Sequence, residues 1–192
     1  MAKELPKRSE VKEEFTWNLA DMYADIPAWE TDVVKIQAMT EALSKMEGRV
    51  CESSQNLLAT LEQNADIERI AYKAMNYASR LSDQDTSDTT HQAMSQKLHG
   101  IISNISSTLS FIEPEILEAD EATLENFYAE APGLELYRGL IEEIQRLKPH
   151  RLSAELEKVM AMTGEMGRTP SQTYSIFTNS DLRFPEMEDE NG

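Results

Sequence analysis

Basic residues are scarce in this chain. Its 192 residues include 18 lysines and arginines against 35 aspartates and glutamates, which gives a formal net charge of −17 and a sequence pI near 4.5. A nucleic-acid-binding protein needs a surplus of cations to neutralise phosphates, and binding to an anionic membrane surface has the same requirement. Both classes are therefore strongly disfavoured. We interpret the acidity as a source of solubility through self-repulsion.

Cysteine is almost absent as well. Cys51 is the only one in the chain, so no intrachain disulfide can form, and no Cys/His signature surrounds it. A lone cysteine of this kind is more often a small, partly buried side chain than a nucleophile. We predict a partly buried thiol, and the sequence assigns it no role.

Long apolar runs are also missing. No stretch approaches the ~20 apolar residues of a membrane-spanning helix, and residues 1–14 carry charges without the apolar segment of a signal peptide. We expect residues 1–14 to form a charged, flexible arm and the chain to be cytoplasmic. The overall composition, 40% hydrophobic and 28% charged, is that of an ordinary globular protein long enough to bury a core.

The motifs of a catalytic or metal site are absent too. The three histidines, His91, His99 and His150, form no His-Glu-x-x-His and no Glu-x-x-His, which excludes the helical zinc motif and the di-iron site of helical bundles. We interpret Asp88-x-x-His91 as a capping aspartate followed by a surface histidine. No glycine-rich phosphate loop occurs, and the acidic tail at 186–190 lacks calcium-loop spacing. The sequence predicts no catalytic, cofactor-binding or metal-binding residue in these 192 positions.

What the chain does contain is apolar periodicity of the helical kind. Apolar residues recur three and four positions apart, as expected for helices packed side by side. The main stripes are Trp29–Leu43, a shorter one around Leu57–Leu61, Ile67–Leu81, Met94–Ile112, Tyr137–Leu147, Leu156–Val159 and Tyr174–Phe177. We predict an all-α lobe of seven or eight antiparallel helices. Its predicted core includes Trp29, Ile70, Tyr77, Leu98, Ile105, Tyr137, Leu140, Ile144 and Leu156.

Capping residues and helix breakers mark the ends of these segments. Residues 15–19, before the first helix, are expected to form an extended segment that lies across the body of the lobe. Side chains that accept hydrogen bonds from free amides favour helix starts, while proline and glycine punctuate helix boundaries. The predicted caps are Asp25, Asp88, Asp120, Ser153 and Thr169, and the predicted breaks lie at Gly48, Pro114, 131–133, Pro149 and Gly164 or Gly167.

The last residues change character. Leu182 and Phe184 alternate with polar neighbours in 180–185, which predicts one short strand, and Asn191-Gly192 is a strong hairpin signal. Because an isolated strand has no partner, we expect the chain to be the front part of something larger. The expected organisation is an arm at 1–14, a helical lobe at 15–179 and the start of a hairpin or linker at 180–192.

Five segments, in this order and spacing, resemble one known family. They are Thr16-Trp17-Asn18-Leu19 with Tyr23, Tyr77-Ala78 leading to Asp83-Gln84-Asp85-Thr86, Ser110–Leu117, Arg146-x-x-x-His150-x-Leu152-Ser153 with Glu157, and Asn179-x-Asp181-Leu182-x-Phe184-Pro185. Each segment is weakly specific alone. Together they cover roughly residues 11–190 and resemble the N-terminal helical lobe of the oligoendopeptidase F family of zinc metallopeptidases.

The resemblance implies a cytoplasmic enzyme that cuts short peptides in a channel between two mostly helical lobes. In the family, zinc is held by the two histidines of His-Glu-x-x-His and a later glutamate, and the motif glutamate acts as base. None of these ligands can be carried over onto the 192 residues. The resemblance therefore implies a non-catalytic part that contributes a wall of the channel, with zinc only in the full-length parent. His150 matches a family position that is not a ligand, and we interpret it as structural.

Two other interpretations remain open. The chain could be a free-standing helical interaction module that kept the lobe and lost the peptidase, or a small helical enzyme or metal carrier unrelated to peptidases. The partners expected from the family interpretation are the absent catalytic domain and, in the parent, an oligopeptide substrate. The isolated chain is expected to self-associate at high protein and salt concentrations, because salt screens its charge while apolar burial persists.

Overall fold

The computed structural model describes residues 10–85 and 88–150 together with seven isolated positions between 156 and 178. In that part of the chain the elements are α-helices joined by turns and short 3-10 helices, and no strand occurs. The predicted all-α class is therefore confirmed, while the strand predicted at 180–185 lies outside the described residues. The chain divides into two compact units, Met1–Arg146 and Leu147–Gly192, and the first contains nearly all of the described residues.

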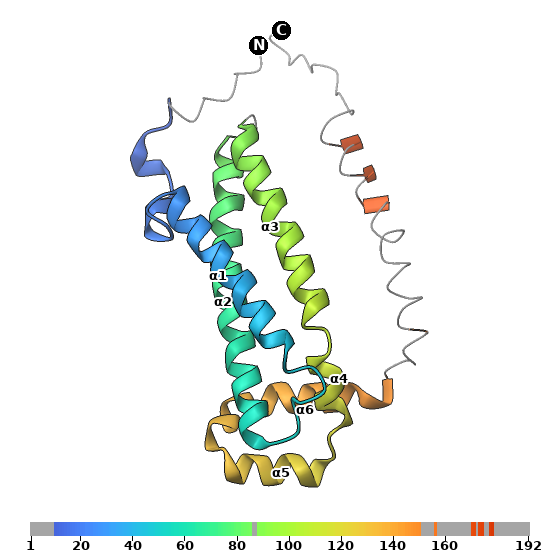
Figure 1. Cartoon of the computed structure of the whole chain (residues 1–192). Coiled ribbons are helices and arrows are strands. Elements are labelled where there is room, and N and C mark those ends of the chain that lie inside the picture. The colour runs from blue at the N-terminus through green and yellow to red at the C-terminus, as the bar shows by residue number, and fades with distance from the viewer. Residues whose placement is uncertain are drawn as a thin grey trace. The chain divides into compact units, whose positions relative to one another are not determined.

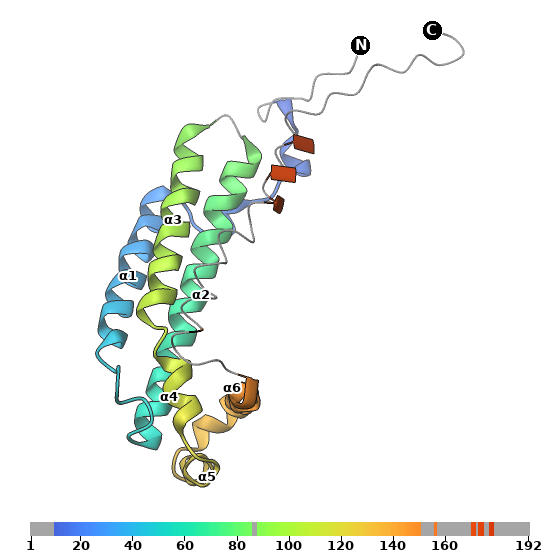
Figure 2. The same cartoon turned by 90° about the vertical axis from the view of Figure 1, so that its right-hand side faces the viewer.

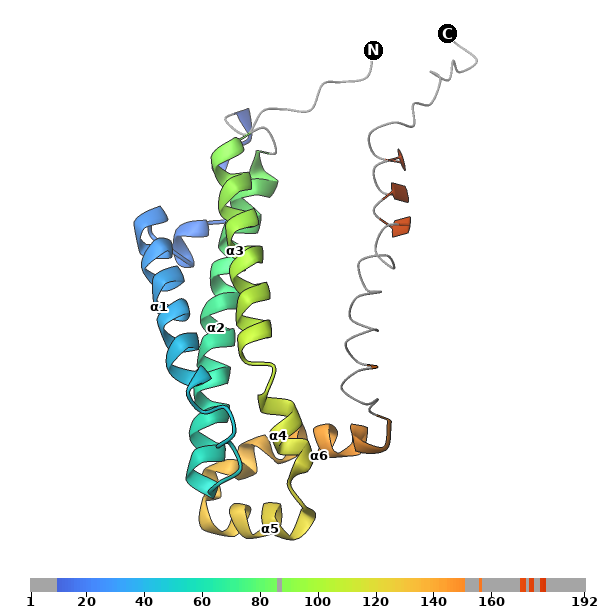
Figure 3. The ribbon, with the colours of Figure 1, turned by 45° about the vertical axis from the view of Figure 1, so that its right-hand side comes forward.

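Three long helices form the body of the first unit. They are α1 (Ile26–Ser44), α2 (Ser54–Gln84) and α3 (Thr89–Thr108), which run side by side with alternating direction (Figures 1 and 3). α2 lies in contact with both α1 and α3. No helix among the described residues is both long and apolar enough to cross a bilayer.

Three shorter helices gather at the end where α1 stops and α2 begins. They are α4 (Ile112–Glu118), α5 (Glu121–Glu130) and α6 (Arg138–Leu147), with a 3-10 helix, Pro132–Tyr137, between the last two. α5 and α6 lie across this end of the long helices rather than along them (Figure 2). The 3-10 helix and α5 both contact α2.

The predicted helix starts in this unit are confirmed by their capping hydrogen bonds. Oδ1 of Asp25 accepts a hydrogen bond from the backbone N–H of Ala28 at 2.9 Å, and Oδ1 of Asp120 accepts one from the N–H of Thr123 at 2.7 Å. Asp88 accepts from the N–H groups of Thr90 and His91 at 2.8 and 3.2 Å. These carboxylates satisfy amides that have no partner inside their helices.

The two helices expected over 57–81 are instead one helix of 31 residues, α2. The apolar stripe is interrupted between Leu61 and Ile67, where the half-buried Asn64 takes an inward position and donates to Glu68 Oε1 at 3.0 Å. No glycine or proline lies in this stretch. A gap in the apolar pattern is therefore not enough to end a helix when the backbone has no reason to break.

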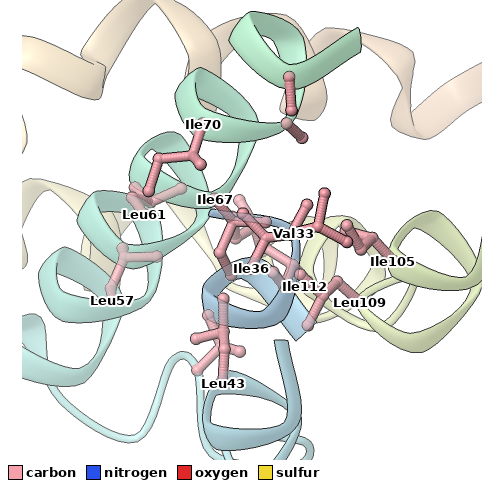
Figure 4. Close-up of a cluster of buried hydrophobic side chains, with 14 of the residues drawn as sticks. Val33, Ile36, Leu43, Leu57, Leu61, Ile67, Ile70, Ile105, Leu109 and Ile112 are labelled. Carbon is pink, nitrogen blue, oxygen red and sulfur yellow. The ribbon is translucent and has the colours of Figure 1, made fainter. Parts of the chain in front are cut away.

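The core lies mainly between α1, α2 and α3 (Figure 4). Six of the predicted core residues are buried: Trp29, Ile70, Tyr77, Leu98, Ile105 and Ile144. Tyr137 is half-buried, whereas the predictions for Leu140 and Leu156 are wrong, since both side chains are about half exposed. Periodicity identifies an apolar face, but it does not say whether a neighbouring helix covers the whole width of that face.

Candidate functional site

The segment at residues 15–19 carries two large aromatic side chains on the surface. Its backbone is extended at Thr16, between the 3-10 turns Glu13–Phe15 and Leu19–Asp21. Phe15 is exposed and Trp17 is 84% exposed, while Leu19 packs against the core. A hollow of about 470 Å³ opens beside Trp17, between this segment and Leu81 and Gln84 of α2. The tryptophan of the first family-like segment is therefore a surface group and not part of the core.

Two tyrosines from the family-like segments meet where this N-terminal segment joins α1 and α2. The Tyr23 hydroxyl donates to Asp32 Oδ2 at 2.9 Å, and its ring stands edge-on to Tyr77 with 5.2 Å between centroids. Lys73 Nζ lies 4.0 Å from the Tyr23 ring centroid. Burial, the hydrogen bond and the charge of Asp32 raise the pKa of Tyr23, and burial raises that of Tyr77. Both phenols stay protonated at neutral pH, which supports a structural role.

A buried hydrogen bond fixes α1 on α2 near this cluster. The indole Nε1–H of Trp29 donates to the backbone carbonyl of Ala74 at 3.0 Å. Trp29 is almost fully buried, so its only polar group needs a partner within the protein. Spacing alone predicted Trp29 as a core residue but gave no indication of this acceptor.

The two histidines whose side chains the structure describes, His91 and His99, lie apart on one helix. His91 and His99 both lie on α3, and eight residues separate their Cα atoms by ~12 Å along the axis. His91 is half-buried rather than on the surface, and its Nδ1 lies 3.4 Å from Asp88 Oδ2. Backbone N–H groups of His91 and Thr90 lower the pKa of Asp88, which is the capping residue that the sequence predicts. The His150 side chain lies outside the description.

The described residues therefore do not fit a zinc centre. Within residues 10–85 and 88–149, no group of three or more histidine, cysteine, aspartate or glutamate side chains could hold a metal ion. Three protein ligands are the minimum for a catalytic zinc site.

Glu115, in the family-like segment Ser110–Leu117, binds a distant loop. It lies in the first turn of α4, and its two carboxylate oxygens accept from the N–H groups of Gly48 at 2.6 Å and Val50 at 2.9 Å. Gly48 has φ of 76°, a left-handed conformation that favours glycine. The loop after α1 is therefore completed by a side chain from α4. Sequence reasoning missed this role, although the glycine marked the loop.

Cys51 follows this loop and is half-buried, as predicted. Burial, and then the negative charge of Glu115, raise the pKa of the thiol to about 11. A thiol with a raised pKa is a poor nucleophile at neutral pH because little of it is ionised. The geometry gives Cys51 a packing role.

Polar contacts hold the three short helices together. The Gln145 side chain on α6 donates from Nε2 to the backbone carbonyls of Ile116 at 2.5 Å and Ala119 at 3.2 Å. Arg138 pairs with Glu125 at 2.8 Å and with Glu135 at 3.0 Å, and its guanidinium lies 3.8 Å from the Tyr128 ring centroid. These side chains fix α6 against the ends of α4 and α5.

One side of this end of the molecule is apolar and exposed. Leu136, at the end of the 3-10 helix, is 83% exposed, and Leu140 on α6 is 51% exposed. Leu147 at the end of α6 is also exposed. We call Leu136, Leu140 and Leu147 the leucine flank.

Comparison with known protein sequences identifies similar peptidases. A family model described as Oligopeptidase F matches residues 115–184. Oligopeptidase PepF of Bacillus subtilis is 35% identical over 192 residues, which are the whole of this chain and 28% of that protein. Group B oligopeptidase PepB of Streptococcus agalactiae is 33% identical over 96% of this chain and 31% of its own length. The chain thus spans about 30% of the curated relatives that it matches.

Two solved structures have the same fold in their matching part. The crystal structure of oligoendopeptidase-F from Enterococcus faecium superposes with a TM-score of 0.68 and 30% sequence identity, covering 88% of this chain and 33% of that one. A putative peptidase from Chlamydophila abortus gives a TM-score of 0.70 at 23% identity, over 98% of this chain and 32% of that one. The second likeness concerns the fold alone.

Proposed function

Because this chain belongs to the oligoendopeptidase F family and matches the N-terminal part of its members, we propose that it is the non-catalytic lobe of a zinc metallopeptidase that hydrolyses short peptides. This proposal is carried by the two coverages of the alignments. Essentially the whole of this chain matches its relatives, but it covers only 28% to 31% of their length. The relatives are oligopeptidases, and the 192 residues hold no His-Glu-x-x-His.

The lobe would act as a wall of the peptide channel. Long helices with a continuous core form a rigid support, and sites built on such elements hold their geometry better than sites on loops. The zinc ligands and the catalytic base would come from the remaining part of the longer polypeptide, because the described residues do not fit a zinc centre. We place this protein in the cytoplasm, as the family resemblance implies.

The test compares residues 1–192 with the polypeptide encoded by the complete reading frame. The frame is expected to continue beyond Gly192 into a His-Glu-x-x-His segment. The longer protein should bind one zinc per chain by atomic absorption and cleave an internally quenched peptide, with cleavage abolished by a chelator. Residues 1–192 alone should bind no stoichiometric zinc and leave the peptide intact.

Two results would overturn the proposal. Tightly bound zinc with chelator-sensitive peptidase activity in residues 1–192 would show that the lobe is itself an enzyme. A stop codon directly after Gly192 would show a free-standing helical module, the alternative that the sequence left open.

A further inference from the structure

The apolar surface of α6 is wider than the neighbouring helices cover. Tyr137, Ile141 and Ile144 face inward, since the first is half-buried and the other two are buried. At ~100° per residue, Leu136, Leu140 and Leu147 project about a quarter turn away from that inward face. All three are exposed. The leucine flank is therefore a second apolar stripe, which begins at the end of the 3-10 helix and continues along α6, and no described part of the chain covers it.

Single exposed apolar residues are common and need no explanation, but an aligned group is different. Val34 on α1 shows the ordinary case, since it is 66% exposed and its neighbour Lys35 is exposed and charged. The leucine flank places three leucines on one side of 12 residues. Stripes of this kind mark docking surfaces for another apolar surface.

The charge around the flank indicates the kind of partner. Residues 112–147 contain ten acidic residues and only two basic ones, Arg138 and Arg146, so this end carries a net charge of −8. Glu135 lies beside Leu136 and pairs with Arg138, and Glu143 lies between Leu140 and Leu147 on the same side of the helix and pairs with Arg146. The excess negative charge of this end comes from the other eight carboxylates. A second copy of this chain would bring its own charge of −17 to the contact. Electrostatic complementarity instead favours a basic partner.

We propose that the leucine flank is the surface through which this lobe docks on the remainder of the longer polypeptide, at an apolar patch bordered by lysine or arginine. This rests on the proposed function. The relatives are about three times as long as this chain. In a polypeptide of that length, the remainder would be a partner covalently linked to this lobe. Interfaces commonly have an apolar centre surrounded by a polar rim, and the leucine flank beside charged residues has that composition.

The experiment uses the complete polypeptide with the double substitution L136E/L140E. The matched control is V34E, which makes the same apolar-to-glutamate change on another helix. Val34 is 66% exposed, a value between those of Leu136 and Leu140. In the complete protein, L136E/L140E should lower the thermal midpoint by several degrees or split unfolding into two transitions, and should reduce kcat/KM on a quenched peptide at least tenfold. V34E should change neither. In residues 1–192 alone, both variants should unfold as the unsubstituted chain does.

A third variant tests the charge of the partner. E143K reverses a charge beside the flank, so in the complete protein it should weaken docking more than E143Q, and the difference should shrink as salt is added. Equal effects of E143K and E143Q at low salt would contradict a basic border.

The outcomes separate this inference from the proposed function. If the complete protein cleaves peptides and L136E/L140E behaves as V34E does, the docking surface is wrong and the function stands. If the complete protein has no zinc-dependent peptidase activity, both fail. If residues 1–192 form a dimer by analytical ultracentrifugation that L136E/L140E abolishes while the complete protein is unaffected, the occupant is a second copy, which overturns the inference.

Discussion

The three long helices bury their apolar faces more completely than the three short helices do. Between α1, α2 and α3, the helices cover one another's inward apolar stripes, and Ile36 and Leu57 are completely buried (Figure 4). Leu98 on α3 is completely buried as well. At the other end, α6 buries Ile141 and Ile144 but leaves the leucine flank exposed.

The difference lies also in what holds each region together. The long helices rely on apolar contact, with one buried hydrogen bond from Trp29 to Ala74 between α1 and α2. The short helices are joined by polar links from Gln145 and Arg138 to neighbouring elements. A region that is fixed by polar links and has an exposed apolar stripe is suited to contact with something else, whereas the long helices cover one another's inward apolar stripes.

The largest expected effect distinguishes a covered leucine from an uncovered one. Leu98→Ala should reduce the free energy of unfolding by ~2–5 kcal/mol, because it removes buried methyl groups and leaves a cavity. Leu140→Ala should cost no more than the ~0.5 kcal/mol typical of surface sites. Urea denaturation of residues 1–192 measures both values. Equal losses would show that the two regions do not differ in coverage.

The next effect concerns the link between the regions. Glu115→Ala leaves the N–H groups of Gly48 and Val50 without their acceptor, and we expect a loss of ~1–3 kcal/mol in unfolding free energy. Glu115→Gln should lose less, since one oxygen remains. Hydrogen exchange at both amides should accelerate in the alanine variant. Unchanged exchange would mean that the loop is ordered without α4; Glu121→Ala, at an exposed site, serves as the control.

The smallest effect is a pH dependence close to that link. The pKa of Cys51 is about 11 in the folded chain, against about 9 for a free thiol. Between these values the unfolded chain has released the thiol proton and the folded chain has not, so stability should fall as pH rises from about 9 to about 11. Cys51→Ala should remove this portion of the alkaline loss. Alkylation of Cys51 by iodoacetamide should also begin at a higher pH in the folded chain than in the chain unfolded in urea. The same pH profile in both states would contradict burial of the thiol.

The sequence predicts well those features that depend on local chemistry. Asp25, Asp88 and Asp120 cap helices as expected, because an N-cap needs only the next few residues. The buried positions of Trp29, Tyr77 and Leu98 follow from spacing along single helices. The family resemblance came from short segments spread along the chain, and the comparisons confirm it.

Features that depend on distant parts of the chain could not be predicted in this way. Leu140 belongs to an apolar stripe, but its burial depends on whether another element reaches it, and none of the described ones does. The contact of Glu115 with Gly48 spans 67 positions, so no local pattern marks it. The continuity of α2 across Asn64 depends on the missing breaker rather than on the apolar pattern.

The Glu115 contact also constrains the order in which parts of the chain can fold during synthesis. Gly48 and Val50 are synthesised more than 60 residues before Glu115. During that interval the nascent chain contains the turn after α1, but the N–H groups of both residues lack this acceptor and are open to water. The long helices can pair during that interval because their contacts need no later residue. Closure of the turn must wait until α4 has left the exit tunnel. Pulsed hydrogen exchange on stalled chains should therefore show amides 48 and 50 becoming protected last among those of residues 26–108.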